Sequence, residues 1–275
     1  MAKILVTGGT GHLGRDLVPA LSQAGHVVRL LARKPMNDPS LQWALGDLAT
    51  GEGIDDALGG IDTVIHAATL SPIARRGMRP IDFFFSPTSV DVEGTRRLLA
   101  ASRRAGIGHF IFVSIVGLEF SSLPYARAKL AGEQLVRECP LAWSVIRATP
   151  FYYLLEQMLG GLKWLPVWPL PNSLSNPVDT RDVARYLAEA VNDGKRGVRP
   201  AIGGPDLMPF SSFARQYYDA LGLRRLVLPL PVSRKMSFKM GLVETNERLG
   251  QRNWRAWLCE RHKHAAVDSH RQAAG

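Results

Sequence analysis

Two residues that could act together as an acid and base pair stand four positions apart, at Tyr125 and Lys129. Pro124 favours a helix start, and residues four apart lie on one face of a helix. A phenol with an ordinary pKa of about 10 is a poor acid or base at neutral pH, but a nearby ammonium stabilises the phenolate and lowers that pKa. The pair could therefore exchange a proton with a carbonyl or hydroxyl oxygen while a cofactor takes or gives a hydride.

A hydride-carrying cofactor needs a binding site, and residues 3–14, KILVTGGTGHLG, have the pattern of one. A short apolar run suited to a buried strand leads into Gly9, Gly11 and Gly14, which have the spacing G-x-G-x-x-G. These glycines allow a tight turn, the close approach of a pyrophosphate and the packing of a helix on the strand. The helix predicted over 15–24 would present its N-terminal N–H groups to the phosphates. A second apolar strand follows, which completes the context that this motif requires.

The string TGGTGHLG at residues 7–14 resembles the extended and atypical short-chain dehydrogenase/reductase families, which include nucleotide-sugar epimerase-like and NmrA-like proteins. The resemblance extends over roughly residues 3–184. It implies an α/β fold with a Rossmann-type doubly wound parallel sheet and a small C-terminal substrate lobe. We therefore predict a cofactor domain over 1–150 and a substrate lobe over 151–275, with 177–204 packing back on the Rossmann core.

The same resemblance assigns roles to three residues. Tyr125 is expected to be the general acid and base, and Lys129 to assist it and to hydrogen-bond the nicotinamide ribose. Ser114 ends the preceding predicted strand and is the candidate catalytic serine, with a structural serine bonded to the backbone as the equal alternative. Ser121 and Ser122 are the runners-up.

Two positions depart from the family pattern. Asp91, in the helix predicted over 90–104, stands where Asn is usual, and Ile115 follows Ser114 where some members have a second serine. We predict an NADP-dependent oxidoreductase that acts on a small carbonyl or hydroxyl substrate. The departures leave open a non-enzymatic NADP(H)-binding redox sensor or assembly subunit of the NmrA-like kind. A nucleotide-sugar epimerase is a third hypothesis, which no diphosphate-binding motif in the C-terminal part supports.

The choice between NAD and NADP depends on the end of the second strand. An acidic residue about 20 positions after the glycines would bind the ribose 2′-hydroxyl of NAD. Ala32, Arg33 and Lys34 stand there instead, and a guanidinium can grip a 2′-phosphate bidentately, so we expect NADP, with NAD as the alternative. In the resembled family an Asp placed like Asp47 contacts the adenine; its other interpretation is a turn-starting Asp. The residues expected to hold the cofactor are Thr7, Gly8, Gly9, Thr10, Gly11, His12, Leu13, Gly14, Arg33, Lys34, Asp47, Leu48, Ala67, Ala68 and Lys129.

Other segments are expected to support these sites. His66, on an apolar strand predicted over 61–68, is expected to be a hydrogen-bonded core residue rather than a catalyst. Prolines and aromatic residues over 71–89 predict a loop. Charges and prolines interrupt the apolar segment 150–171, which favours a loop covering the substrate. Either the substrate pocket or structural packing would use the aromatic residues Phe83, Phe84, Phe85, Phe151, Tyr152, Tyr153, Trp164 and Trp168.

The composition is that of a globular protein, with 275 residues, 46% hydrophobic and 21% charged. Two isolated cysteines predict neither a disulfide framework nor a zinc site, and the C-terminal His262, His264 and His270 lack convincing ligand partners. No uncharged apolar run reaches the roughly 18 residues of a transmembrane segment, and no signal peptide is recognised, so the cytoplasm is expected.

The net charge of +10 is concentrated near the C-terminus, where residues 224–275 carry 11 Lys and Arg against 4 Asp and Glu. A solvated helical face is favoured over a nucleic-acid or anionic-lipid surface, so a small-molecule substrate is the expected partner and no nucleic acid is expected. A homodimer through the helix predicted over 90–104 is also an expectation, although the arginines of that helix would need acidic partners or solvent.

Overall fold

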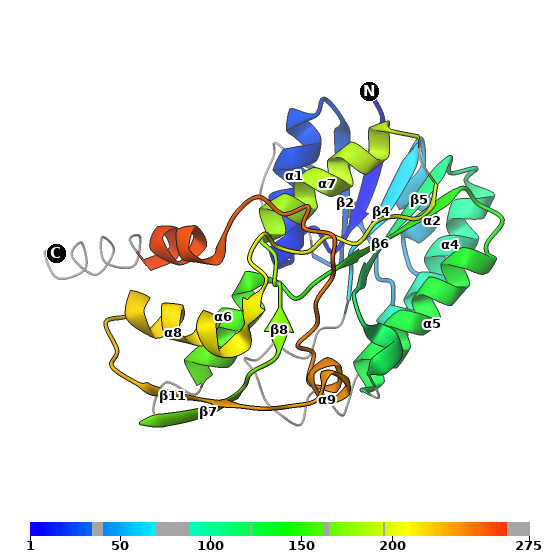
Figure 1. The fold of residues 1–275 in the computed structure, drawn as a ribbon. Helices are drawn as coiled ribbons and strands as arrows, with labels where there is room; N and C mark the ends of the chain where they lie inside the picture. The colour runs from blue at the N-terminus through cyan, green and yellow to red at the C-terminus, as the bar shows by residue number, and fades with distance from the viewer. Residues whose placement is uncertain (35–40, 70–88, 122, 162–164, 195, 263–275) are drawn as a thin grey trace, which may run out of the picture. The chain divides into compact units, whose positions relative to one another are not determined.

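The computed structural model describes residues 1–34, 41–69, 89–121, 123–161, 165–194 and 196–262 (Figure 1). The chain divides into two compact units: Met1–Ala148 with Thr180–Ala201, and Thr149–Asp179 with Ile202–Gly275. Phe83 to Phe85, Ser122, Trp164, His264 and His270, and most of the loop predicted over 71–89, lie outside the described residues. Within the described part of the chain, no helix is long and apolar enough to cross a membrane.

A seven-stranded sheet forms the centre of the first unit, with the order β3-β2-β1-β4-β5-β6-β9. Every neighbouring pair is parallel. The chain thus runs outward from β1 in one direction and then returns to continue in the other, which confirms the predicted Rossmann-type fold. The strands are β1 (Lys3–Thr7), β2 (Val27–Ala32), β3 (Gln42–Leu45), β4 (Thr63–His66), β5 (His109–Ile115), β6 (Trp143–Ala148) and β9 (Gly197–Val198).

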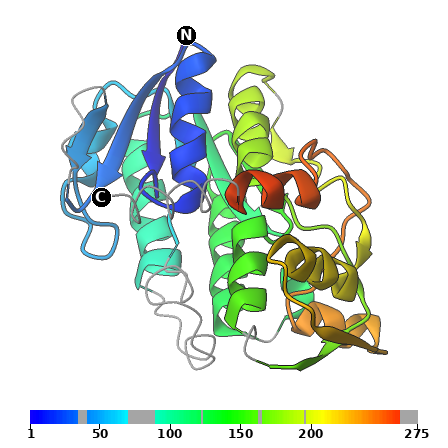
Figure 2. The same cartoon turned by 90° about the vertical axis from the view of Figure 1, so that its left-hand side faces the viewer.

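Helices cover both faces of this sheet, as Figures 1 and 2 show. Apolar side chains of α2, α4 and α5 pack on one face in a shared core with residues such as Val64, Phe110 and Val145. Helices α1 and α7 lie on the other face. The helices of this unit are α1 (His12–Gln23), α2 (Ile54–Leu58), α4 (Thr95–Arg104), α5 (Pro124–Glu138) and α7 (Thr180–Asn192), with the short 3-10 helix η3 (Leu118–Phe120) after β5.

The helix predicted over 90–104 differs from an α-helix in its first turn. The segment η2 (Ser89–Gly94) is π-helical, and the regular helix α4 begins only at Thr95. The Thr95 hydroxyl donates a hydrogen bond of 2.8 Å to the Asp91 carbonyl oxygen within this turn. Single π-helical turns are rare, and those that occur are often found at functional sites. The spacing of apolar residues in the sequence does not distinguish such a turn from an α-helix.

The second unit contains α6 (Tyr152–Gly161), β7 (Val167–Pro171), β8 (Leu174–Ser175), β10 (Met208–Pro209), α8 (Phe210–Ala220), β11 (Leu226–Leu230), α9 (Arg234–Lys239) and a helix over 254–262. The prediction of a loop over 150–171 is wrong, because α6 and β7 occupy most of that segment. Tyr152, Leu155 and Leu159 recur at helical spacing and are buried in the core of this unit. The prolines fall before and after the helix rather than inside it.

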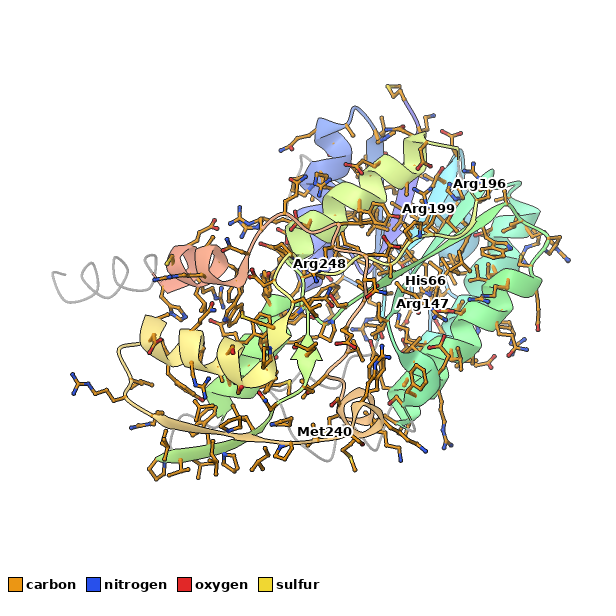
Figure 3. All side chains as sticks on the ribbon, viewed as in Figure 1. His66, Arg147, Arg196, Arg199, Met240 and Arg248 are labelled. Atoms are coloured by element: carbon orange, nitrogen blue, oxygen red, sulfur yellow. The ribbon has the colours of Figure 1, made fainter. Side chains whose placement is uncertain are left out.

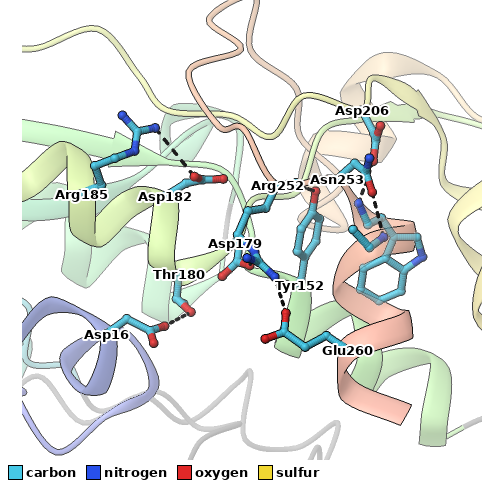
Figure 4. A network of polar contacts seen from close by, with 12 residues as sticks. Asp16, Tyr152, Asp179, Thr180, Asp182, Arg185, Asp206, Arg252, Asn253 and Glu260 are labelled. Carbon is cyan, nitrogen blue, oxygen red and sulfur yellow. Dashed lines mark hydrogen bonds and ion pairs between the residues drawn. The ribbon is translucent and has the colours of Figure 1, made fainter. Parts of the chain in front are cut away.

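Aromatic packing holds the second unit together. Tyr152 and Trp168 are each 1% exposed, so they are core residues. Trp254 stacks on Trp257 with a ring-centroid distance of 5.1 Å. The Arg252 guanidinium pairs with the carboxylates of Asp179 and Glu260, while the Tyr152 hydroxyl donates to the Arg252 carbonyl oxygen (Figure 4). These contacts assign Tyr152 and Trp168 to packing, which was one of the two uses that the sequence left open.

Candidate functional site

The glycine-rich loop follows β1 and packs directly on the end of β4. Gly8 has a φ of +78°, and a Cβ there would lie 2.7 Å from the Ala68 nitrogen. A Cβ on Gly14 would lie 2.4 Å from the Gly8 carbonyl oxygen. Side chains are therefore excluded at both positions, which lets the loop pack closely on itself and on the segment after β4. The structure thus brings Gly8 and Gly14 together with Ala67 and Ala68, two segments that the sequence assigned to one cofactor site.

Helix α1 begins inside this loop. Its N-cap residue is Gly11, no side chain among the described residues caps it, and its first turn contains no acidic residue. The first-turn N–H groups of a helix have no intrahelical partners, and the helix dipole makes this end positive. Thr10 and His12 are exposed there, whereas Leu13 is buried. The loop is therefore suited to an anion such as a pyrophosphate.

Two basic residues follow the end of β2, and a turn that begins with an aspartate follows the end of β3. Arg33 and Lys34 directly follow β2 and are exposed. Asp47 lies after β3, where its carboxylate accepts a 2.8 Å hydrogen bond from the Ala49 N–H, the geometry of a turn-starting Asp. Leu48 is 7% exposed. This turn uses one oxygen of Asp47, and a role in cofactor binding stays a prediction.

Lys129 is the most constrained of the predicted catalytic residues. Its side chain lies under α5 and is 4% exposed, with Nζ 3.8 Å from Asp91 Oδ1. Nζ also donates to the Val113 carbonyl oxygen on β5 at 3.4 Å and lies 5.1 Å from the Phe112 ring centroid. Tyr125 stands one helical turn earlier on α5 and is half-buried. The helix thus holds the ammonium against the carboxyl end of β5, on the face that Tyr125 shares.

Burial and charge act in opposite directions on Lys129. Burial lowers the pKa of the ammonium, and the carboxylates of Asp91 and Glu133 offset part of that effect. Asp91 is 2% exposed, and its Oδ1 also accepts a hydrogen bond of 2.5 Å from the Thr69 hydroxyl. The carboxylate that replaces the usual Asn therefore forms a buried ion pair with the lysine.

Lys129→Met is expected to lower the free energy of unfolding by about 3–5 kcal/mol, because it leaves the Asp91 carboxylate buried without its cation. Urea denaturation measures this loss. The double variant Asp91→Asn/Lys129→Met removes both charges and keeps an acceptor for Thr69, so it is expected to regain most of the stability. If Lys129→Met unfolded at the same urea concentration as the wild type, the Lys129 ammonium would not stabilise the buried Asp91 carboxylate.

A chain of hydrogen bonds joins the glycine-rich loop to Asp91 through His66, which lies on β4 and is labelled in Figure 3. The Thr95 hydroxyl gives its hydrogen to the Asp91 carbonyl, so it accepts from His66 Nε2 at 2.9 Å. His66 Nδ1 then accepts from the Thr7 hydroxyl at 2.7 Å, and the Thr7 oxygen accepts from the Ala68 N–H at 3.3 Å. This order fixes His66 as the neutral tautomer with its proton on Nε2.

The same burial makes stability depend on pH. Burial lowers the pKa of His66 to about 3, with a smaller contribution from the Lys129 charge. In the unfolded chain the His66 imidazole has its ordinary pKa of about 6.5, so below that pH it binds a proton that it does not bind in the folded chain. The contribution of His66 to folding is therefore complete above pH 6.5 and is lost as the pH falls toward 3, by up to about 1.4 kcal/mol per pH unit.

His66→Gln is therefore expected to flatten the acid side of the stability profile. Gln keeps one donor and one acceptor but does not titrate, so the slope between about pH 6 and pH 4 should fall by about 1.4 kcal/mol per pH unit. Urea denaturation at several pH values measures the slope. An unchanged slope would mean that His66 binds a proton in the folded protein.

Ser114 lies on the face of the sheet covered by α5. On the neighbouring strand β6, Arg147 lies opposite Ser114. The Arg147 guanidinium donates hydrogen bonds of 2.7 and 2.8 Å to the Glu133 carboxylate on α5 and one of 2.5 Å to the Glu119 carboxylate on η3. Ser114 is 2% exposed, and hydrogen bonding from its side chain contributes to the lowered pKa of the Glu133 carboxyl. A catalytic role for Ser114 stays a prediction, as does one for the runner-up Ser121, whose hydroxyl oxygen accepts from the Leu123 N–H at 3.3 Å.

Sequence reasoning missed the residues that hold this site in place. Glu133 is 1% exposed, and although its burial opposes ionisation, hydrogen bonds and charge from Arg147 keep its pKa below the usual range. The available signal was the spacing of Lys129 and Glu133, four apart on a helix whose other inward residues are small or apolar. In the part of the chain that the structure describes, no three His, Cys, Asp or Glu side chains gather in a group that could hold a metal ion.

Comparison with known proteins agrees with this geometry. The model of a family described as NAD(P)H-binding matches residues 8–194. A 3-beta-hydroxysteroid dehydrogenase of Mycolicibacterium neoaurum is 34% identical over 42% of this chain and 32% of that protein. The photosystem II assembly factor Ycf39 of Cyanophora paradoxa is 30% identical over 73% of this chain and 63% of that protein. The chain thus spans less than two thirds of each of these relatives.

A solved structure extends the likeness to the whole fold. A short-chain dehydrogenase/reductase superfamily protein from Agrobacterium tumefaciens, solved with bound NAD, has a TM-score of 0.73 at 20% identity. The match covers 98% of this chain and 99% of that chain. The parallel sheet, the glycine-rich loop and the family match give one conclusion. The chain belongs to the family described as NAD(P)H-binding, and its fold is similar to that of the short-chain dehydrogenase/reductase superfamily protein.

Proposed function

We propose that the protein is an NADP(H)-dependent oxidoreductase that reduces a small carbonyl substrate or oxidises the corresponding alcohol. The observation that carries this proposal is the position of Lys129. Its ammonium contacts the Val113 carbonyl near the carboxyl end of β5, with Tyr125 one helical turn away. The glycine-rich loop follows β1 at the same edge of the parallel sheet, which is where this fold binds dinucleotides.

The residues present suit such a cofactor. Gly8 and Gly14 let the loop over 7–14 fold tightly beside the segment after β4, and the N-terminus of α1 supplies N–H donors for a pyrophosphate. Arg33 and Lys34 would bind a 2′-phosphate, which favours NADP over NAD. Asp47, Leu48, Ala67 and Ala68 would line the adenine side and the sheet edge, and Lys129 would hydrogen-bond the nicotinamide ribose. When bound, NADPH supplies the hydride that the carbonyl carbon accepts.

Tyr125 completes the reduction. Its phenol donates a proton to the carbonyl oxygen as the carbonyl carbon becomes an alcohol carbon, and the resulting phenolate regains a proton from solvent. The Lys129 ammonium stabilises that phenolate. The Asp91 carboxylate holds the Lys129 ammonium at 3.8 Å, and the Thr69 hydroxyl in turn donates a hydrogen bond of 2.5 Å to that carboxylate. The similarity to a 3-beta-hydroxysteroid dehydrogenase supports this kind of reaction.

A carbonyl screen tests the proposal. The purified protein is mixed with NADPH and a panel of aliphatic, aromatic and alicyclic aldehydes and ketones, and the loss of NADPH absorbance is followed together with the alcohol product. We expect NADPH-dependent formation of an alcohol from at least one class of carbonyl. Retained NADPH with no alcohol formed across the panel would count against the oxidoreductase.

A second candidate is an NADP(H)-responsive assembly role. It is supported by the burial of Ser114 and by the similarity to an assembly factor over 73% of this chain. Stable NADPH binding without turnover, combined with a protein partner whose affinity differs between NADPH and NADP⁺, would favour it.

We include in the proposal a cytoplasmic location and a homodimer. Cell fractionation tests the location, and light scattering tests the homodimer.

A further inference from the structure

The second unit has an apolar strand face that its own core does not use. Strands β7 and β11 pair in parallel, with Leu226 opposite Val167 and Leu228 opposite Pro169. Trp168 and Leu170 of β7 and Val227 of β11 point inward and are 1%, 5% and 7% exposed. Other side chains of the two strands point outward: Val167 is 42% exposed, Leu226 63% and Leu228 48%. An exposed two-stranded ribbon of this composition is typical of an interaction site.

Helix α9 continues this apolar face. Leu230 at the end of β11 is 40% exposed, and Met236 and Met240 are 49% and 48% exposed. The ribbon and α9 lie at the same edge of the unit in both views (Figures 1 and 2), and Figure 3 labels Met240 there. We name the outward side chains Val167, Leu226, Leu228, Leu230, Met236 and Met240 the ribbon face.

Positively charged residues flank the ribbon face along the chain. The segments 165–176 and 226–233 contain no charged residue, whereas residues 221–244 carry five Lys and Arg against one acidic residue, Glu244. The five cations stand immediately before β11 and within α9, and they are Arg224, Arg225, Arg234, Lys235 and Lys239. Arg234 pairs with Glu244 at 3.1 Å and is still 76% exposed. An uncharged apolar centre with a cationic border is therefore present in one short stretch of the fold.

This combination favours one kind of partner. A second copy of the chain, docked through the same face, would bring two sets of five cations together with only one carboxylate on each side. A membrane surface rich in anionic lipid has the complementary arrangement, since acyl chains accept Leu, Val and Met while lipid phosphates attract Lys and Arg. We propose that the ribbon face docks this protein on the surface of an anionic lipid membrane, a binding activity separate from the reaction proposed above.

Vesicle flotation tests the proposal on the full chain. Vesicles of phosphatidylcholine alone are compared with vesicles containing 30% phosphatidylglycerol, a composition taken as roughly that of an anionic leaflet. We expect the protein to float with the anionic vesicles only, and to be released as the salt concentration rises. Lys235→Glu/Lys239→Glu is expected to reduce the bound-to-free ratio at least tenfold, since each cation near such a surface contributes about fivefold.

Two matched variants separate this face from general properties of the chain. Arg96→Glu/Arg103→Glu makes the same change in net charge at two exposed residues of helix α4. This variant is expected to bind the anionic vesicles as the wild type does. Leu228→Asp is expected to abolish binding, whereas Val198→Asp, at a side chain that is 52% exposed on β9, is expected to preserve it. Circular dichroism confirms that each variant is folded.

The alternatives give different results. Equal losses in the α4 and α9 charge variants would assign the binding to net charge and overturn the proposal. No binding to vesicles of either composition would exclude a lipid surface, and the ribbon face would then belong to an acidic protein partner. Binding to phosphatidylcholine alone that ignores Lys235 and Lys239 would also contradict the proposed role of the cations.

Discussion

Gly14→Ala is expected to weaken NADPH binding at least a hundredfold. A Cβ at this position would lie 2.4 Å from the Gly8 carbonyl oxygen and from the Gly9 Cα, closer than folded proteins tolerate. These contacts are with backbone, so the added methyl must displace the loop that would receive the pyrophosphate. Fluorescence titration of NADPH measures the loss, and circular dichroism confirms that the variant is folded.

Two other glycines provide graded controls. At Gly11 a Cβ would lie 3.2 Å from the Gly8 oxygen, so Gly11→Ala is expected to cause a smaller loss of affinity. At Gly108, in the exposed turn before β5, a Cβ would make only an ordinary contact of 3.5 Å with the Asp62 oxygen, so Gly108→Ala should bind NADPH as the wild type does. Equal affinity in all three variants would remove the loop from the cofactor site.

Tyr125→Phe is expected to lower kcat by about 10²–10⁴ while the Kd for NADPH stays unchanged. The phenyl ring keeps the packing of the half-buried tyrosine, and Lys129 keeps its contacts with Asp91 and Val113. The substitution removes the hydroxyl that would donate the proton. Steady-state kinetics on the substrate found in the carbonyl screen, paired with NADPH titration, separates these two quantities.

The matched control is Tyr186→Phe on α7, which loses a 3.2 Å hydrogen bond from its hydroxyl to the Pro200 carbonyl oxygen and a side-chain hydrogen bond with Arg199. We expect this variant to retain wild-type kcat. If Tyr125→Phe also turned over at the wild-type rate, another group would have to supply the proton, and the proposed mechanism would be wrong.

The sequence predicted the first unit well where local patterns and family motifs agree. The apolar run before the glycines became β1, and Pro124 became the first residue of α5. In these segments the apolar spacing, the turn residues and the element length all point to one structure.

The prediction failed where the deciding contacts are distant in sequence. The segment 150–171 forms α6 and β7 because its apolar residues find a core of aromatic side chains from α8 and the helix over 254–262. The ion pair between Asp91 and Lys129 joins residues 38 positions apart through a π-helical turn that has no sequence signature. Arg147 likewise joins Glu119 and Glu133 from separate elements. Such pairs become visible only once the sheet order is known.

Titration calorimetry of the wild-type protein with NADPH and with NADH tests the central claim most directly. We predict that NADPH binds at least tenfold more tightly, a difference of about 1.4 kcal/mol. Arg33→Ala is expected to remove this preference and to leave the affinity for NADH unchanged, because only the 2′-phosphate loses its partner. If neither nucleotide binds, the glycine-rich loop and the basic end of β2 do not form a cofactor site, and the proposed oxidoreductase is contradicted.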